Sequence, residues 1–219
     1  MNSDEQSETA PVRLDPPAEL SMALGEAMFT QRAIRRFDPQ RPISDQQLRL
    51  VLDAATKAPT GANIQPVRPL VIRDRELIRR FGALYHEAWW AKRADAYGWE
   101  PDQELPVDSP YVMPALLASE MVDAPVVVLF WSTGAPGNSV FPAVQNMMLA
   151  ARALGIGSVL TTLHPSVMSR VHEMFDVPAD VRFHCCVPLG YPRGAFGTTQ
   201  RLPSSVTTNW NRWGQSPPW

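Results

Sequence analysis

The stretch from Val140 to Leu154 reads as a helix that is apolar on nearly every face. A helix exposed to water keeps a polar face, so a helix without one is buried in a core or at an interface. The residues before it, Ala124–Trp131, form a short β-branched run typical of a buried strand. The chain must therefore cover this helix with other elements, either its own or those of a second subunit.

A clear start and stop define another helix nearer the beginning of the chain. Ser44 and Gln47 have the spacing of a capping box, in which each side chain bonds the other residue's backbone N–H. The residue before a proline avoids the helical conformation, so we expect this helix to end before Pro59. Its apolar face comprises Leu48, Val51, Leu52 and Ala55.

The remaining elements alternate irregularly along the chain. We expect a helix after Pro17, a strand at Arg68–Arg73, a helix at 75–95, a strand at Gly155–Thr161, a helix capped by Ser166 and a strand at Arg182–Leu189. This order lacks the regular strand–helix–strand units of a parallel sheet, which predicts an α+β protein. Residues 86–118 have the weakest periodicity, and we expect a lid or an insertion there.

Composition limits the domain organisation and the class of partner. A chain of 219 residues is long enough for one substantial core and short for two full domains. We expect a disordered tail at 1–16 and a single domain at 17–219, which ends in an extended arm at 197–219. A net charge of −2 gives no basic surplus for nucleic acid, and no apolar run reaches the roughly 18 residues of a membrane span. The acidic, polar start lacks the regions of a signal peptide, so we expect a cytoplasmic protein.

Cys185 and Cys186 are the only cysteines in the chain. A disulfide between neighbours in sequence is strained. In a strand the two side chains point to opposite faces of the sheet. We therefore expect two structural thiols rather than a redox pair.

Arg32, Arg35 and Arg36 form a cluster near the start of the chain, and Arg201 lies near its end. A guanidinium is a planar, permanently charged donor that binds phosphate well. Adjacent charges also occur on ordinary solvated surfaces. On the residues alone, the cluster fits either a phosphate site or a polar surface.

The segment Pro59–Pro66 offers a second set of ligand-binding groups. Small residues such as Gly61 let a ligand approach the backbone, and the carboxamides of Asn63 and Gln65 can bond a flat heterocycle. The same residues suit turns, so a plain loop explains them equally well. A phosphate site together with a ring site indicates a mononucleotide cofactor.

Other motifs are excluded by their context. Gly155–Gly157 follows a helix instead of a strand, and Leu160 occupies the position of the third glycine of a dinucleotide-binding motif. The histidines and cysteines lack metal-ligand spacing, and the chain has no P-loop and no Gly-x-Ser-x-Gly turn. Trp89, Trp90 and Trp99 fit a core patch, a partner surface or a flap over a flat substrate.

Five segments, in order, resemble the FMN-dependent nitroreductase family from about residue 26 to residue 212. Arg32–Phe37 is similar to the family's Arg-Ser-x-Arg-x-Phe, and Ala58–Pro66 to its Ala-Pro-Ser-x-x-Asn-x-Gln-Pro-Trp segment. The family's central helix, closing strand and late phosphate-binding arginine resemble Ala143–Gly157, Val187–Pro192 and Arg201–Pro203. The resemblance implies a mixed, mainly antiparallel sheet flanked by helices, in an intertwined homodimer with exchange of C-terminal arms.

The resemblance also implies which residues bind the cofactor. FMN would lie at the homodimer interface, with its phosphate held by Arg32, Arg35 and Arg201. The residues along the rest of the cofactor would be Ala33, Pro59, Thr60, Gly61, Asn63, Gln65, Leu160, Thr161 and Thr162. We expect no dedicated catalytic side chain, because the flavin carries the chemistry.

Several positions depart from the family pattern. Gln31 and Ala33 stand where many members have Arg and Ser, which removes two phosphate donors. Val67 replaces a frequent Trp, and Thr161-Thr162 replaces an acidic residue of some members. These changes affect the expected flavin contacts and the substrate preference, and they leave the arginine clamp in place.

The activity that the resemblance implies is hydride transfer from NAD(P)H to FMN, followed by reduction of a nitroaromatic or quinone-like acceptor in a ping-pong cycle. Alternatives are a flavin-binding storage or sensor protein without turnover, a related flavin-dependent dehalogenase or dehydrogenase, and an interaction module whose arginines are surface residues. The expected partners are a second copy of the chain and a small-molecule acceptor. No metal, nucleic acid or membrane is expected.

Overall fold

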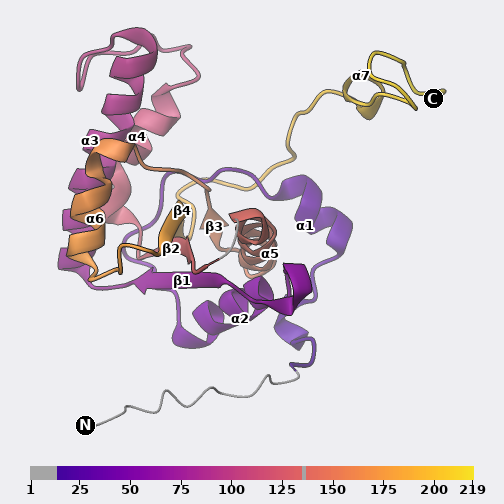
Figure 1. Ribbon diagram of the computed structural model, residues 1–219, viewed down its shortest axis with the longest axis horizontal. Helices are drawn as coiled ribbons and strands as arrows, with labels where there is room; N and C mark the ends of the chain where they lie inside the picture. Colours follow the sequence, from indigo (N-terminus) through magenta and orange to yellow (C-terminus); the bar gives the residue numbers. More distant parts are fainter. Residues whose placement is uncertain (1–13, 135–136) are drawn as a thin grey trace.

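A four-stranded antiparallel sheet forms the centre of the computed structural model, which describes residues 14–134 and 137–219 (Figure 1). The strand order is β1-β2-β4-β3. The strands are β1 (Val67–Ile72), β2 (Val126–Ser132), β3 (Gly157–Ser158) and β4 (Arg182–Gly190). The α+β prediction is confirmed. Residues 1–13 of the expected tail lie outside the described residues.

Strand β2 divides the core into two parts because its side chains alternate between the two faces of the sheet. Val127 and Leu129 belong to one cluster of buried residues, whereas Val128 and Phe130 belong to the other. Both faces are covered, which explains why the strand is an unbroken apolar run. The register places Leu129 opposite a residue of β1 and a residue of β4.

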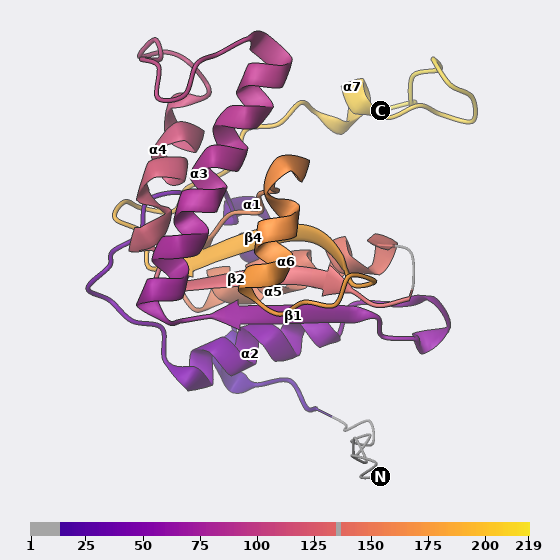
Figure 2. The same ribbon diagram turned by 60° about the vertical axis from the view of Figure 1, so that its left-hand side comes forward.

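Helices cover both faces of the sheet (Figures 1 and 2). One face carries α3 (Arg75–Tyr97), α4 (Val112–Glu120) and α6 (Met168–Met174). The other face carries α2 (Asp45–Thr56) and α5 (Val140–Ala153), with α1 (Leu24–Thr30) beside α5. Short 3-10 turns occur at Ala18–Leu20, Gly61–Asn63, Met121–Asp123, Gly137–Ser139 and Pro165–Val167. None of the helices in the described ranges is long and apolar enough to cross a membrane.

The apolar helix that constrained the sequence is α5, and it is buried against the sheet and α2 as predicted. Val144 and Met147 have no exposed surface. Burying a side chain of this size stabilises the fold by about 1.5–3 kcal/mol. Phe141, at the start of α5, is the exception, with 48% of its surface exposed.

The capping box predicted at the start of α2 is present. The hydroxyl of Ser44 accepts a hydrogen bond from the N–H of Gln47 at 3.2 Å, and the side chain of Gln47 accepts one from the N–H of Ser44 at 3.2 Å. The helix ends at Thr56, before Pro59. The strands predicted at 68–73, 124–131 and 182–189 also form, with ends shifted by one or two residues.

Three predicted elements are wrong in detail. The helix expected after Pro17 is interrupted, and only Ala18–Leu20 and α1 are helical. The strand expected at 155–161 is reduced to β3 and a single bridge between Thr161 and Cys186. Ser166 is not a cap: its N–H donates to the side chain of His164, which caps the turn that leads into α6.

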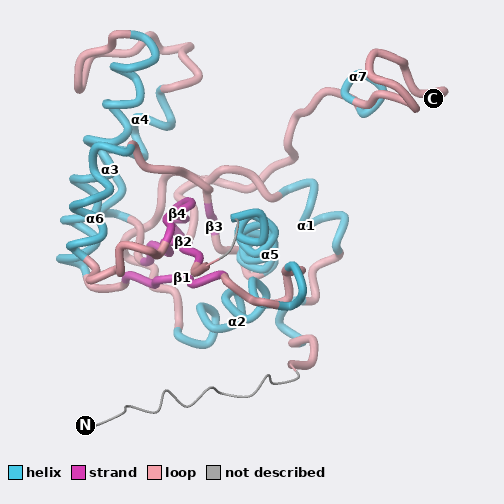
Figure 3. The backbone as a smooth tube through the Cα atoms, viewed as in Figure 1, coloured by secondary structure: helices cyan, strands magenta, loops and turns pink. Residues whose placement is uncertain are grey.

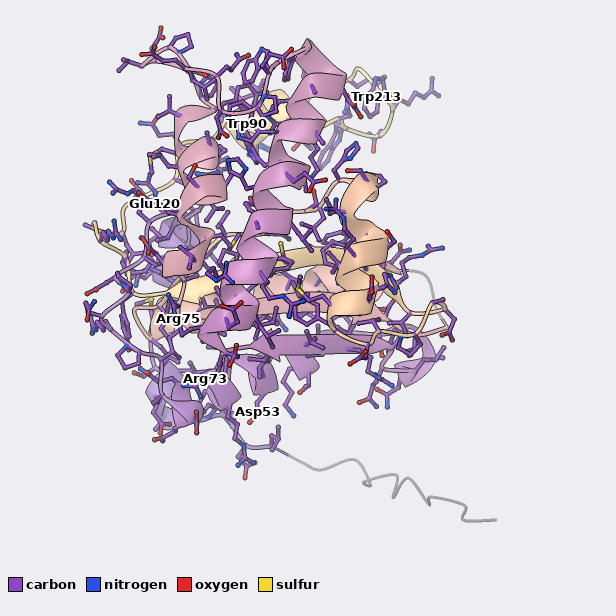
Figure 4. All side chains as sticks on the ribbon, turned by 90° about the vertical axis from the view of Figure 1, so that its left-hand side faces the viewer. Asp53, Arg73, Arg75, Trp90, Glu120 and Trp213 are labelled. Atoms are coloured by element: carbon purple, nitrogen blue, oxygen red, sulfur yellow. The ribbon has the colours of Figure 1, made fainter. Side chains whose placement is uncertain are left out.

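Most of the stretch 86–118, where we expect a lid or an insertion, is helical. Helix α3 continues to Tyr97 and ends at Gly98, whose φ of 67° is the left-handed conformation that glycine adopts without steric cost. Trp89 and Trp90 are 5% exposed, so these two belong to the core. Trp90 is labelled in Figure 4. The part without regular structure is 98–111.

The last residues leave the body of the molecule as an arm (Figure 3). Residues 197–219 contain a single helical turn, α7 (Ser204–Thr207), and Trp213 is 93% exposed. The rings of Trp210 and Trp219 pack on each other at 5.0 Å, so the tip of the arm contacts itself. In this single chain, residues 197–219 extend away from the sheet, and the exchange of arms between two chains stays a prediction.

Candidate cofactor site

The segment Gln31–Phe37 is extended and is attached to the edge of the sheet. The N–H of Ile34 donates to the carbonyl of Ser158 at 3.0 Å, and Ala33 forms a parallel bridge with the same residue. Ile34 is buried in the core, whereas Arg32 is exposed. This bridge is parallel, whereas the four strands of the sheet pair in antiparallel fashion.

The three clustered arginines have different environments. Arg36 donates from Nε and Nη2 to the carboxylate of Glu120 at 3.0 and 3.2 Å. Arg32 and Arg35 have no ion-pair partner within the described residues. Arg32 lies beside the C-terminal segment, since a Cβ added to Gly197 would be 3.7 Å from its Nη1. Arg36 is therefore engaged within the fold, and Arg32 and Arg35 are available to bind an anion.

Arg35 faces a cavity of about 400 Å³ behind helix α3, which we call the α3 cavity. Its lining residues are Arg35, Tyr85, Trp89, Lys92, Arg93, Pro114, Leu117, Val159, Leu160, Thr161 and Thr162. Burial lowers the pKa of the Arg35 guanidinium, and the nearby charge of Arg32 adds to this effect. A cation that is partly desolvated and without a counter-ion favours binding of an anion.

Thr161 and Thr162 form the floor of the α3 cavity and are firmly held. The backbone of Thr161 exchanges two hydrogen bonds with Cys186 of β4, at 2.8 and 2.9 Å. The hydroxyls of Thr161 and Tyr85 are 2.9 Å apart. The ammonium of Lys92 donates to the carbonyl and the hydroxyl of Thr162, both at 2.6 Å. The structure thus brings a cation directly beside the two threonines.

Burial sets the protonation of the groups around these threonines. It lowers the pKa of Lys92, and the neighbouring Arg93 lowers it further. It raises the pKa of Tyr85, so this hydroxyl stays neutral over the physiological range. The α3 cavity therefore combines cations and neutral donors.

The loop at 58–66 has the opposite character, because most of its side chains are exposed. The hydroxyl of Thr60 accepts a hydrogen bond from the N–H of Gln65 at 3.2 Å and closes the loop. The loop carries three non-glycine residues at positive φ: Ala62 (48°), Asn63 (56°) and Gln65 (53°). Such conformations cost about 1 kcal/mol or more each and cluster at functional sites.

Gly61 is not explained by the fold of the single chain. Its φ lies outside the left-handed region, and a Cβ added there would meet no atom within 4 Å. Neither backbone geometry nor packing therefore requires a glycine. Space for the close approach of a flat ring would explain it.

The predicted cofactor residues fall into three places. Arg35, Leu160, Thr161 and Thr162 meet in the α3 cavity. Thr60 and Gln65 line a different cavity of about 200 Å³, formed with residues of α2, β1 and α5. Arg201 lies in the exposed arm, where its Nη1 donates to the carbonyl of Gln200 at 2.7 Å. The arm passes near Arg32, because the N–H of Thr199 donates to the carbonyl of Phe29 at 3.0 Å.

Three polar residues of the α3 cavity were missed by sequence reasoning: Tyr85, Lys92 and Arg93. With Trp89 they are spaced by three, four, seven and eight residues, which places them on one face of α3. That spacing was visible in the sequence. It was not used because the region from 86 was interpreted as a lid or an insertion, although the helix was expected to continue to about 95.

The residues present suit a phosphorylated flavin. Arg32 and Arg35 are free cations of the kind that hold a phosphate, and Gly61 leaves room against the backbone. Thr161 and Thr162 offer hydroxyls and backbone groups, with a positive charge beside them. An α+β protein with this combination is typical of flavin-dependent oxidoreductases.

Comparison with known proteins identifies the family. The sequence pattern of the Nitroreductase family matches residues 29–191. The chain therefore belongs to the Nitroreductase family and is a flavin oxidoreductase of that family.

Two curated relatives and one solved structure illustrate the likeness. The "Putative NADH dehydrogenase/NAD(P)H nitroreductase" of Archaeoglobus fulgidus is 28% identical over 168 residues, which cover 76% of this chain and 83% of the relative. The iodotyrosine deiodinase of Thermotoga neapolitana is 28% identical over 169 residues, which cover 74% of this chain and 84% of the relative. The crystal structure of an oxidized iodotyrosine deiodinase bound to FMN and 3-iodo-L-tyrosine has a TM-score of 0.67 and 24% identity, and covers 83% of this chain and 96% of that one. The last likeness establishes a shared fold.

Proposed function

We propose that this protein is an FMN-dependent oxidoreductase that takes hydride from NAD(P)H and reduces nitroaromatic or quinone-like acceptors in a ping-pong cycle. The observation that carries the proposal is the α3 cavity, where Arg35, Thr161 and Thr162 meet in a chain of the Nitroreductase family. FMN, when bound, supplies the hydride and electron transfer. The name of the Archaeoglobus relative, which includes NAD(P)H nitroreductase, supports this activity.

The chain's own residues bind and orient the cofactor in this proposal. Arg32, Arg35 and Arg201 hold the phosphate end. The residues beside the rest of the cofactor are Ala33, Pro59, Thr60, Gly61, Asn63, Gln65, Leu160, Thr161 and Thr162. Lys92, fixed to Thr162 at 2.6 Å, brings a positive charge that stabilises negative charge developing near these threonines.

We further propose that the site is completed in a homodimer. Within one chain, the α3 cavity and the cavity of Thr60 and Gln65 are separate. Leu24 and Phe29 of α1 are 68% and 70% exposed, and Phe141 of α5 is also exposed. Exposed large apolar side chains are typical of interfaces, so we assign these three to the contact with the second copy. The arm would cross to the second copy.

The two thiols of β4 fit a cytoplasmic protein. Both are free and buried, as expected for the reducing conditions of that compartment. The division into a tail at 1–16 and one domain at 17–219 is part of the same proposal, and the body of that domain is the two-sided sheet described above.

An absorbance spectrum of the purified protein, recorded before and after anaerobic NADPH or NADH, tests the proposal. We expect flavin bands that bleach with the reductant and recover when a quinone or nitroaromatic is added. Light scattering on the same sample should give twice the mass of one chain. A colourless protein that does not take up added FMN would refute the cofactor assignment, and a monomer that retains flavin would refute the shared site.

Reductive dehalogenation is a second candidate, because a curated iodotyrosine deiodinase is among the relatives. The reduced protein should then be reoxidised by 3-iodotyrosine faster than by a quinone. Bound flavin that no nicotinamide bleaches would instead identify a storage or sensor protein.

A further inference from the structure

One wall of the α3 cavity is not used by the proposed cofactor contacts. It is formed by Trp89 and Arg93 of α3 together with Pro114 and Leu117 of α4. Figure 2 shows α3 and α4 side by side along one side of the sheet. Lys92, which is adjacent to Arg93 on α3, bonds Thr162, so this wall borders the position proposed for the flavin.

Arg93 is held in a rigid position on this wall. Its guanidinium carbon lies 4.8 Å from the ring centre of Trp89 and 4.7 Å from that of Tyr111. Stacking between two aromatic rings fixes the plane of the guanidinium. Its Nε is buried and has no hydrogen-bond partner within the described residues. A buried donor without a partner is costly, so a bound acceptor group there would be stabilising.

The positive charge of the α3 cavity is not neutralised by the nearby carboxylates of the same helix. Glu87 pairs with Arg170 of α6, and Asp95 bonds His164 at 2.9 Å. No Asp or Glu is among the residues that line the cavity. Arg35, Lys92 and Arg93 consequently share one space without a counter-ion among the described residues.

The rest of the wall is apolar. Trp89, Leu117 and Val159 are buried, and together with Pro114 they offer a flat surface beside the cations. A cavity of about 400 Å³ is within the range that takes small organic ligands. Apolar walls with a few fixed charges select a ring that carries an anionic group.

We propose that the α3 cavity binds aromatic electron acceptors that carry a carboxylate, with Arg93 as the main ligand of that carboxylate and Lys92 adding positive charge. The inference rests on the proposed oxidoreductase function and names the substrate class of the same site. Neutral acceptors of the same shape bind less tightly, because they leave the Arg93 donor unpaired.

The test compares benzoate with benzamide, which has a similar shape without the charge. FMN-loaded protein is titrated with each by calorimetry and by the change in the flavin absorbance bands. We expect benzoate to bind at least about tenfold more tightly, as one charge-assisted contact provides. In Arg93→Gln the ratio of the affinities for benzoate and benzamide should fall close to one. In Arg80→Gln, a control at an exposed position of the same helix, it should match the wild type.

Two outcomes overturn the inference. Equal affinity of the wild type for benzoate and benzamide would do so whether or not any variant folds. Release of FMN by benzoate, seen as free-flavin fluorescence, would show that the cations serve the cofactor instead. If Arg93→Gln does not fold, Arg93→Met, whose apolar side chain can still pack on Trp89 and Tyr111, replaces it, with the same loss of preference expected.

Failure of the inference is distinct from failure of the proposed function. Normal bleaching by NAD(P)H with no preference for benzoate leaves the oxidoreductase proposal intact. A clear preference for benzoate in a protein that no nicotinamide bleaches leaves an anion-binding cavity and refutes the oxidoreductase.

Discussion

The α3 cavity and the 58–66 loop are two parts of one candidate site, and they are built in opposite ways. The floor of the α3 cavity is fixed by backbone bonds between Thr161 and Cys186 and by the bonds of Tyr85 and Lys92. The loop is exposed, and its closing contact is one hydrogen bond from the backbone of Gln65 to Thr60. One part is held by the core, and the other presents its residues to the solvent.

The contrast indicates which part of the candidate site a single chain can form by itself. Cations in the α3 cavity are positioned without any ligand, because α3 and β4 are rigid elements of the core. The loop stores backbone strain at Ala62, Asn63 and Gln65 and keeps an unexplained glycine at 61. Under the proposed dimer, these features make sense only when a cofactor and a second chain cover the loop.

Loss of a free arginine should have the largest effect on the cofactor. We expect Arg32→Ala to weaken FMN binding by about 10–100-fold, since one charge-assisted contact contributes about 1.5–3 kcal/mol. Fluorescence titration of the apoprotein with FMN measures this change.

Arg36→Ala is the matched control for this prediction. Arg36 is four residues away and already bonds Glu120, so its loss should leave FMN affinity within about twofold and lower only the stability. Equal losses of affinity in the two variants would mean that the arginines act through the fold rather than on the phosphate.

Sequence reasoning predicted the fixed part of the molecule better than the site. The capping box at Ser44 and the apolar run of α5 are local signals, and both formed as expected. The helix expected at 75–95 already contained Lys92 and Arg93, and their spacing from Tyr85 and Trp89 was a local signal that would have placed them on one helix face.

The other features depend on tertiary structure. The positive φ values of Ala62 and Asn63 are set by the surrounding fold rather than by residue preference. The pairing of Arg36 with Glu120 joins residues 84 positions apart, so the residues alone did not distinguish this arginine from Arg32 and Arg35, and only the family resemblance did.

A methyl group at Gly61 should have a smaller effect, confined to the loop. Gly61→Ala meets no protein atom, so we expect the free energy of unfolding to stay the same or rise by up to about 1 kcal/mol. FMN affinity should fall by about tenfold if the ring lies against this backbone. Gly194→Ala, where a Cβ is equally free of contacts, should change neither quantity.

Mixing the two variants shows whether the two parts come from different chains. Consider a heterodimer of one Arg32→Ala chain and one Gly61→Ala chain. If each of its two sites takes Arg32 from one chain and Gly61 from the other, one site carries both substitutions and the other site carries neither. Half of the sites should then bind FMN with wild-type affinity. If both parts belong to one chain, every site of the heterodimer carries one defect and no wild-type site appears.

The smallest effect concerns the strand that anchors the α3 cavity. Burial raises the pKa of the Cys185 thiol from its ordinary 9.0 to about 12 and also raises that of Cys186. Between these pH values the unfolded chain releases the Cys185 proton while the native chain keeps it. Stability therefore falls as pH rises through this window, by about 1.4 kcal/mol at pH 10 for one such thiol.

Urea unfolding of the wild type and Cys185→Ala at pH 7.5 and pH 10 isolates this contribution. The alanine variant starts less stable, because it leaves a small cavity, and it should lose about 1.4 kcal/mol less between the two pH values. Other titrating groups change the stability of both proteins equally, so their contributions cancel when the two losses are subtracted. Parallel losses would mean that the thiol ionises freely in the native state. The face of β4 opposite the cavity would then be open to solvent, and β4 would no longer be the rigid anchor that the contrast requires.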